Sequence, residues 1–404
     1  MNIYLLSLSV LLALLVAGCS PQSSPAPLAD GNRATPAPPL RVLHDGSEQE
    51  RAALDEPFVG VTTEGSVVPG LYTLQATGVS TAPLREAVKA FRASLTDEQR
   101  AASSFPIDDE EWRRWTNIDI KYYKRQGVGL NELTPEQREL GLNILRAGLS
   151  PQGYQKTKDI RKMEGYLARL SGAFEVVGPD LYWFTFLGEP STTEPWGWQF
   201  DGHHLVINYF VLGNQVVMTP TFMGSEPSYI AYGEDAGTRT FEREEALGIS
   251  LYQSLTDRQR QAATLYDRKE ENYTLAGAFH DNAEVPYAGV RASNFTPRQV
   301  SLLSELLGEY VNNMAEGHAR VKMAEVEKHL PDTWFAWVGD TGGGGPFYYR
   351  IQSPVILIEF DHQRPVFLEG DRPTRAHVHT VVRTPNGNDY GKDLLGQHLE
   401  RHPH

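Results

Sequence analysis

Residues 198–209 read Trp-Gln-Phe-Asp-Gly-His-His-Leu-Val-Ile-Asn-Tyr, and residues 349–360 read Tyr-Arg-Ile-Gln-Ser-Pro-Val-Ile-Leu-Ile-Glu-Phe. Each segment contains an apolar run with the length and composition of a buried β-strand. The two segments align without a gap at an offset of 151 residues. The same β pattern at two places in one chain suggests a fold built from two similar units.

Four more pairs of segments match in the same order along the chain. They are 91–101 with 251–261, 133–137 with 295–299, 183–188 with 334–339, and 216–220 with 381–385. Five ordered matches indicate an internal duplication. We expect one large domain over residues 51–404, made of two similar halves at about 82–230 and 240–404.

Local signals predict the elements of each half. Four Thr-x-x-Gln capping boxes, at Thr96, Thr134, Thr256 and Thr296, predict helix starts, and Ser150-Pro151 predicts a helix over 151–171. Strands are expected at 181–187, 204–211, 215–222, 334–338, 355–361 and 377–384, with a hairpin turn at Gly213-Asn214. The prediction is an α+β fold in which helices precede a short antiparallel meander in each half. The meanders would share a central sheet, and the site would lie where the halves meet.

The N-terminus predicts a lipoprotein signal. Its apolar stretch is too short to cross a bilayer, and Val16-Ala17-Gly18-Cys19 resembles the lipobox of bacterial lipoproteins. The resemblance implies cleavage before Cys19 and acylation of its thiol; an ordinary signal peptide with a chance cysteine is the alternative. Residues 1–19 would then be the signal, and residues 20–50, rich in Pro, Ser and Ala, a tether. By analogy with lipoprotein sorting, Ser20 suggests a lipid anchor in the outer membrane of a bacterial cell envelope.

Charge and cysteine content narrow the range of partners. The net charge is −14 at pH 7, which disfavours binding to nucleic acid and suits binding of cations. Cys19 is the only cysteine, so the mature domain has no internal disulfide and no cysteine available as a metal ligand.

Histidines are the strongest candidate metal ligands. His377 and His379 lie two apart in a β-branched run, so on a strand they share one face. Neutral imidazoles suit zinc, which we favour, or copper, iron or manganese. His203 and His204 are adjacent, so at most one of them would join a given site unless the glycine before them bends the chain. His398 could also reach the site, while exposed or core histidines are the alternative throughout.

Three further residues are candidates for catalysis. Glu359 shares a face of its apolar strand with Asp361 and could be a general base or hold an imidazole, although a different strand register would place His362 beside the histidine pair instead. Asp389 could be a base or only cap a helix. Arg383 could clamp an anionic substrate or pair with a carboxylate.

Trp196-Gly-Trp198-Gln-Phe-Asp201-Gly202-His203-His204, with His377-Val-His379 and Asn388-Asp389-Tyr390-Gly391, resembles the bacterial secreted proteins of domain-of-unknown-function family 3500. The resemblance covers roughly residues 80–400. It implies the domain boundaries and a site but no reaction.

Two hypotheses about function follow. In the first, His377, His379 and His203 or His204 hold a metal in a periplasm-facing hydrolase or oxidoreductase, with Glu359 or Asp389 as the base. In the second, the chain is a non-catalytic envelope lipoprotein that binds a metal, a glycan or other small molecule, or a protein. An open coordination position beside a pocket would favour the enzyme. A third interpretation is that the histidines form only a buried hydrogen-bond network.

Overall fold

The computed structural model describes residues 48–402 except 341 and 343. Within that range the fold is mixed α/β, with one large sheet. Its strands are β1 Ser104–Phe105, β2 Val128–Gly129, β3 Tyr182–Leu187, β4 Trp196–Gly202, β5 Leu205–Leu212, β6 Gln215–Val217, β7 Thr221–Ser225, β8 Thr264–Tyr266, β9 Val290–Arg291, β10 Trp334–Gly339, β11 Phe347–Gln352, β12 Leu357–His362 and β13 Val378–Arg383. The expected signal, Cys19 and nearly all of the tether lie outside the described residues.

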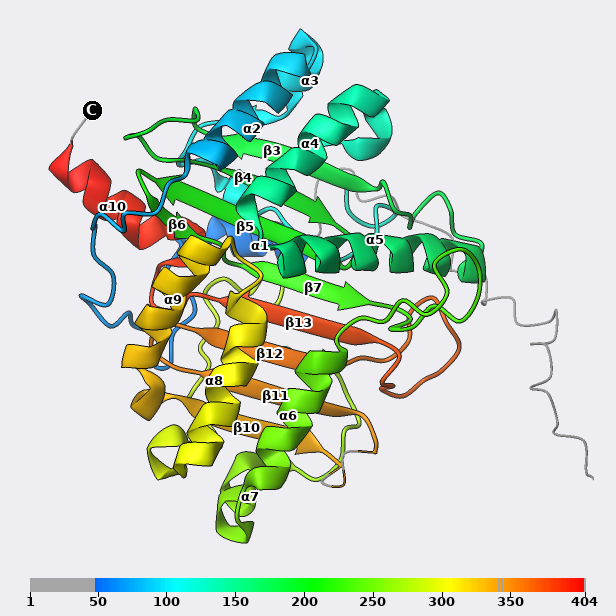
Figure 1. Ribbon diagram of the computed structural model, residues 1–404, viewed down its shortest axis with the longest axis vertical. Coiled ribbons are helices and arrows are strands. Elements are labelled where there is room, and N and C mark those ends of the chain that lie inside the picture. The colour runs from blue at the N-terminus through cyan, green and yellow to red at the C-terminus, as the bar shows by residue number, and fades with distance from the viewer. Residues whose placement is uncertain (1–47, 341, 343, 403–404) are drawn as a thin grey trace, which may run out of the picture.

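The two expected meanders join in this single sheet. The long path of the 13-stranded sheet runs β1-β3-β4-β5-β7-β13-β12-β11-β10-β8, and β2, β6 and β9 pair with β3, β5 and β10. At the centre β7 and β13 pair antiparallel, with His379 opposite Gly224 and Val381 opposite Phe222. Segments more than 150 residues apart in the sequence therefore lie side by side in the middle of the molecule (Figure 1).

Eight of the ten helices in the described residues lie over one face of the sheet, with α2 to α5 over one half and α6 to α9 over the other (Figure 1). The helices are α1 Glu48–Asp55, α2 Ala82–Ser94, α3 Asp97–Ala102, α4 Pro135–Gly148, α5 Pro151–Ser171, α6 Glu242–Ser254, α7 Asp257–Ala263, α8 Pro297–Val311, α9 Glu316–Lys328 and α10 Lys392–Arg401. No helix among the described residues is long and apolar enough to cross a membrane.

Helix starts follow the predicted local chemistry. All four Thr-Gln capping boxes form, at the first residues of α3, α4, α7 and α8. Ser150 caps α5 by accepting the backbone N–H of Gly153 at 3.0 Å, and the helix spans the predicted residues 151–171. Each cap satisfies amides that the helix itself leaves unpaired, which fixes where the helix begins.

The two faces of the sheet differ in chemistry. The helix-covered face is apolar: Trp198 and Tyr209 stack at 5.0 Å and pack against Gly148 of α4, while Tyr349 packs against Gly248 of α6. The opposite face carries buried polar side chains and is covered mainly by loops, with the short helix α1 behind the sheet (Figure 1). We call these the helix-covered face and the loop-covered face.

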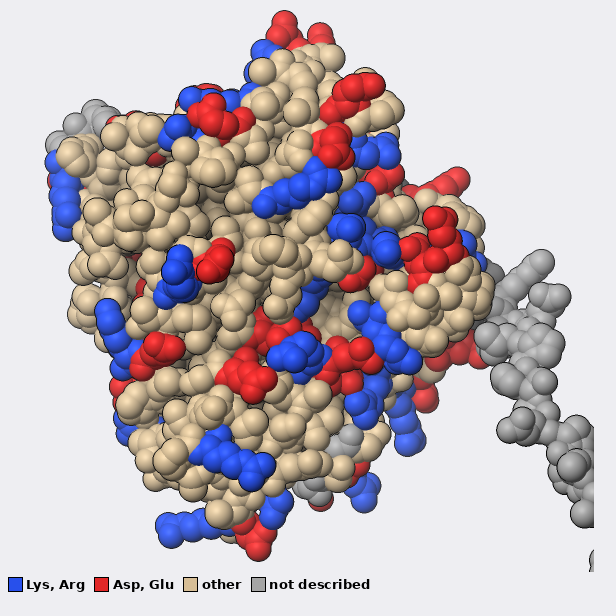
Figure 2. All heavy atoms as spheres, in the orientation of Figure 1, with Lys and Arg blue, Asp and Glu red and all other residues tan. Residues whose placement is uncertain are grey.

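Ion pairs link the helices across the middle of the helix-covered side. Lys156 of α5 pairs with Glu244 of α6, and Arg243 of α6 pairs with Glu309 of α8 at 2.9 Å. Acidic and basic side chains form a mixed cluster there, whereas elsewhere on this face the charged side chains are scattered (Figure 2). The first pair ties a helix of one half to a helix of the other, and the second joins two helices of the second half.

Two predicted strands need correction. The segment 215–222 is not one strand, because β6 ends at Val217 and β7 begins at Thr221, and both pair with β5. Residues 203–204 are a turn and not strand, since Gly202 pairs directly with Leu205. The predicted hairpin turn at Gly213-Asn214 is confirmed, with Gly213 at φ 61°.

Candidate metal centre

Three imidazoles converge beside the central pair of strands. His204 lies in the two-residue turn between β4 and β5, where its φ is 59°. His377 immediately precedes β13, and His379 lies within it, opposite Gly224 of β7. The backbone N–H of Gly224 donates to the carbonyl of His204 at 2.8 Å, which joins the turn to the same place.

The Nε2 atoms of these rings face one another. His204 Nε2 lies 3.3 Å from His377 Nε2, which lies 2.9 Å from His379 Nε2. The three ligand atoms all lie within 4.8 Å of one another, and we call these residues the histidine trio. Two nitrogens bound to tetrahedral zinc at about 2.0–2.1 Å lie about 3.3 Å apart. The spacing therefore suits one shared metal ion.

Outer partners fix which nitrogen carries the proton in two of the three rings, those of His204 and His377. Glu164 of α5 lies 2.7 Å from His204 Nδ1, and the carbonyl of Arg364 lies 2.6 Å from His377 Nδ1. Carboxylates and carbonyls only accept, so both Nδ1 atoms must donate. Nε2 of both neutral rings is then a lone-pair acceptor, and their 3.3 Å contact joins two acceptors. A cation between them would remove this repulsion.

The electrostatic environment opposes protonation of the three imidazoles. Burial and the neighbouring imidazoles lower the pKa of His204 to about 4, and the same causes hold the pKa of His377 and His379 well below the usual range. Glu164 is buried, but its two histidine partners lower its pKa to about 2, so it stays ionised. Neutral imidazoles with an ionised carboxylate behind them are the form in which histidine binds metals.

His203 belongs to the outer shell of the trio. Its Nδ1 donates to the second oxygen of Glu164 at 2.8 Å, and its ring contacts that of His204, with centroids 3.8 Å apart and an interplanar angle of 37°. Glu164 therefore holds both rings of the turn. We expected at most one of the two histidines in a given site unless the chain bends; in the structure a turn brings both rings to Glu164, and only His204 points its Nε2 at His377.

A segment after β12 covers the trio. Glu226, which follows β7, accepts the backbone N–H groups of residues 366–368 at 3.0–3.3 Å. Its Oε2 lies 3.9 Å from His377 Nδ1, and burial raises its pKa. The ring of Phe367 lies 5.5 Å from that of His203. Glu226 thus secures the segment over the site.

Gly224 leaves the space that the rings occupy. A Cβ at this position would lie 3.0 Å from Cδ2 of both His204 and His379 and 2.7 Å from the carbonyl of Val378. Real Cβ atoms do not approach backbone that closely, so only glycine fits without movement of the strands or rings.

The other predicted site residues have different partners. Arg383 is fully buried on the loop-covered face and bonds to Asp281 at 2.8 Å and Asp389 at 3.2 Å. Its two other donors meet the carbonyls of Ala276 and Gly277. Arg383 is therefore not a free substrate clamp, because every guanidinium nitrogen is bonded within the protein.

Asp389 and Glu359 also serve the loop-covered face. Asp389 accepts the backbone N–H of Thr384 at 2.7 Å, and burial raises its pKa to about 6. Glu359 accepts from the backbone of Leu275 and Ala276 and from the hydroxyl of Tyr348 at 2.8–2.9 Å. Their partners lie in the protein scaffold, so we assign neither a catalytic role.

His398 lies apart from the trio. It is on α10, and its Nε2 lies 3.5 Å from Oε2 of Glu194 in the loop before β4. The groups of metal-ligating side chains among the described residues are the trio and the set Glu164, His203 and His204, and neither includes His398. The structure thus does not bring His398 together with the other candidate ligands.

Sequence reasoning missed Glu164 and Glu226. Glu164 lies within the predicted helix 151–171, between the buried residues Met163 and Gly165. A carboxylate on the buried side of a helix requires a partner, and this signal could have pointed to it. Glu226 follows a strand in a loop, where nothing in the sequence pattern marks it.

Comparison with known proteins defines the family but no activity. A family model described as "Protein of unknown function (DUF3500)" matches residues 77–392. No curated protein and no solved structure matches the chain. The matched segment contains both halves of the sheet and every residue of the trio. The chain therefore belongs to the DUF3500 family of proteins of unknown function.

Proposed function

We propose that this protein binds one divalent transition metal through His204, His377 and His379, with zinc as the favoured ion and copper, iron or manganese as alternatives. The observation that carries the proposal is the contact of two acceptor nitrogens, Nε2 of His204 and His377, at 3.3 Å. Glu164 and the Arg364 carbonyl act as the outer partners that metal-binding imidazoles use.

The site has the ligand number of a catalytic centre. Structural zinc is held by four protein ligands, whereas catalytic zinc has three and an open position. His379 is only partly buried, which suits access from outside. A bound metal would act as a Lewis acid on a substrate oxygen. We therefore favour a metal-dependent hydrolase, or an oxidoreductase if the metal is copper or iron.

A non-catalytic binding protein is the second candidate. Burial of His204 and His377, together with the segment that Glu226 holds over them, favours retention of a metal over turnover. The ligand in that case would be the metal itself, a glycan or another small molecule at the cell envelope. We expect no nucleic-acid partner, because the net charge is −14.

We also propose that the chain is a lipoprotein anchored through acylated Cys19 in the bacterial cell envelope, in the outer membrane. The lipobox-like sequence at 16–19 supports this. A Cys19→Ser substitution should release the protein from the membrane fraction. Mass spectrometry of the wild-type N-terminal peptide should show a diacylglyceryl cysteine, and an unmodified Cys19 would contradict the proposal.

We infer further that the two halves arose by internal duplication. The ordered sequence matches support this, as does the order of the strands, which ascends from each edge of the sheet to its centre. The trio would then span the join of the halves, since His204 comes from one half and His377 and His379 from the other.

The metal proposal can be tested by elemental analysis of the mature domain without a His-tag. Wild type should contain about one metal per chain, and a folded His377→Ala/His379→Ala variant should contain none. Absence of metal from wild type, even after incubation with zinc, copper, manganese or iron salts, would leave the hydrogen-bond network as the better account.

A further inference from the structure

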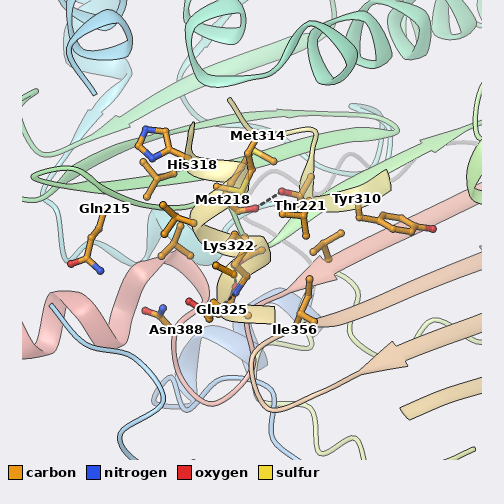
Figure 3. A pocket seen from close by; sticks show the side chains of 18 of the residues that line it. Gln215, Met218, Thr221, Tyr310, Met314, His318, Lys322, Glu325, Ile356 and Asn388 are labelled. Atoms are coloured by element: carbon orange, nitrogen blue, oxygen red, sulfur yellow. Dashed lines mark hydrogen bonds and ion pairs between the residues drawn. The ribbon is translucent and has the colours of Figure 1, made fainter. Parts of the chain in front are cut away.

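A cavity of about 450 Å³ lies between the helix-covered face of the sheet and helices α8 and α9 (Figure 3). Thr221 and Thr380 of the central strands line it on one side, and Tyr310 and Met314 at the end of α8 on the other. None of the trio lines it. Its volume is typical of a small-molecule site. Close-packed protein interiors contain few voids larger than a water molecule, so a cavity of this size is unusual.

The interior suits a flexible apolar chain. Met218, Met223 and Met314 line it, and methionine adapts its shape to apolar ligands. The threonine hydroxyls there are already used: Thr221 donates to the carbonyl of Met218 at 2.6 Å, and Thr380 to that of Met223 at 2.8 Å. The wall therefore offers contact surface with few free donors.

One end of the cavity is polar because of helix α9. His318, Lys322, Glu325 and His329 follow one another at intervals of four, three and four residues, so they share one face of the helix, and all line the cavity. His318 is 6% exposed, and its ring has no hydrogen-bond partner among the described residues. Its ring nitrogens are not fully enclosed by protein, so a ligand in the cavity would accept a hydrogen bond from one of them.

Lys322, Glu325 and Lys328 of α9 line that end, which gives it one more positive than negative charge. Both carboxylates that line the cavity are paired, Glu325 with Lys322 at 2.6 Å and Glu244 with Lys156. Lys328 lines the mouth, is exposed, and has no partner within the part of the chain that the structure describes. In a chain of net charge −14, this local excess favours an anionic group.

We propose that the cavity binds an amphiphilic monocarboxylate, such as a medium-chain fatty acid. The alkyl chain would lie against the three methionines, and the carboxylate would accept from His318 and lie beside Lys322 and Lys328. This proposal is independent of the metal site, because it uses other residues on the other face of the central strands.

Isothermal titration of the mature domain with dodecanoate, dodecanol and dodecylamine tests the proposal. We expect one dodecanoate per chain, bound at least about tenfold more tightly than either analogue, because only the carboxylate can accept charge-assisted hydrogen bonds from the lysine and histidine side chains. Lys322→Gln and His318→Gln should each weaken dodecanoate binding by about tenfold. Lys89→Gln, which removes an exposed lysine on α2, is the matched control and should leave it unchanged.

A cavity-filling variant, Met314→Trp, should abolish binding if circular dichroism shows that it folds; if it does not fold, the two charge variants decide alone. Equal binding of dodecanoate and dodecanol would overturn carboxylate recognition. No saturable binding of any chain, or full binding by folded Met314→Trp, would overturn the site itself.

Discussion

Replacing Glu164 by glutamine tests the trio without touching a ligand. Glu164 accepts from Nδ1 of both His203 and His204, at 2.8 and 2.7 Å. Glutamine has one acceptor oxygen and one donor group, so only one ring can keep its bond. The other ring must turn or move its proton to Nε2. If that ring is His204, it can no longer offer Nε2 to a metal.

The expected losses are large enough to measure. Removal of an outer partner of a metal-bound histidine lowers metal affinity about 10–100-fold, which corresponds to about 1.4–2.7 kcal/mol. The apoprotein should also lose stability, because a hydrogen bond to a charged group contributes about 1.5–3 kcal/mol and the glutamine amide leaves one buried ring unpaired. Both effects come from one carboxylate that is 1% exposed.

Competition with a chromophoric chelator gives the affinity, and urea denaturation of the chelator-treated protein gives the stability. Glu175→Gln makes the same chemical change at an exposed position and should alter neither quantity. If Glu164→Gln bound metal as tightly as wild type, the proposed role of Glu164 in fixing the His204 tautomer would be refuted.

Three further perturbations have definite outcomes. Gly224→Ala should cost about 1–3 kcal/mol of unfolding free energy and lower the metal affinity, because the added Cβ meets His204 and His379 at 3.0 Å. Gly396→Ala is the control: its Cβ meets nothing within 4 Å, so it should be neutral or stabilising in the same assays. The pKa of His204 is about 4 in the fold and about 6.5 when unfolded, so the unfolded chain binds more protons in this window and stability falls as pH drops through it. Urea denaturation of metal-free protein should therefore show wild type losing about 2 kcal/mol more than His204→Gln between pH 7.5 and 5.0, and parallel curves would contradict this assignment. Arg383→Met should cost about 3–5 kcal/mol because buried Asp389 loses its charged partner, whereas Asp281 keeps Arg113 at 3.1 Å. The folded fraction should keep its metal; loss of metal without loss of stability would place Arg383 in the site after all.

Signals confined to a few neighbouring residues predicted the helices well. The capping box at Thr134 and the Ser150-Pro151 pair mark helix starts through bonds within one turn, and both helices begin where predicted. The apolar runs likewise predicted the central strands, because burial on both faces of a sheet requires them. These features depend on interactions among residues that are close together in the sequence, so a short segment is enough to predict them.

Register and the outer partners of the site depend on distant segments. The structure pairs Asp361 with His379, so Glu359 and Asp361 share the face of His379, whereas the first-half hairpin register would have placed His362 there. Even so, Asp361 forms an ion pair with Lys269 at 2.9 Å and does not join the trio. A shared face therefore did not identify the partners, because the segment that covers the face supplies them.

The turn at residues 203–204 shows why a pattern based on strand alternation was insufficient. Alternation would send His203 and His204 to opposite faces. A two-residue turn with His204 at positive φ instead brings their rings into contact on one side, where Glu164 reaches both. Only the pairing of β4 with β5 reveals this, since the turn has no glycine at the position of positive φ.

Anomalous diffraction from crystals of the metal-loaded mature domain tests the central claim most directly. Data collected on both sides of the absorption edge of the bound element should show one peak between the Nε2 atoms of His204, His377 and His379, about 2.0–2.1 Å from each if the ion is zinc. A site with no peak, and with one ring turned to donate Nε2–H to its neighbour, would contradict the account and show that the trio is a hydrogen-bond network.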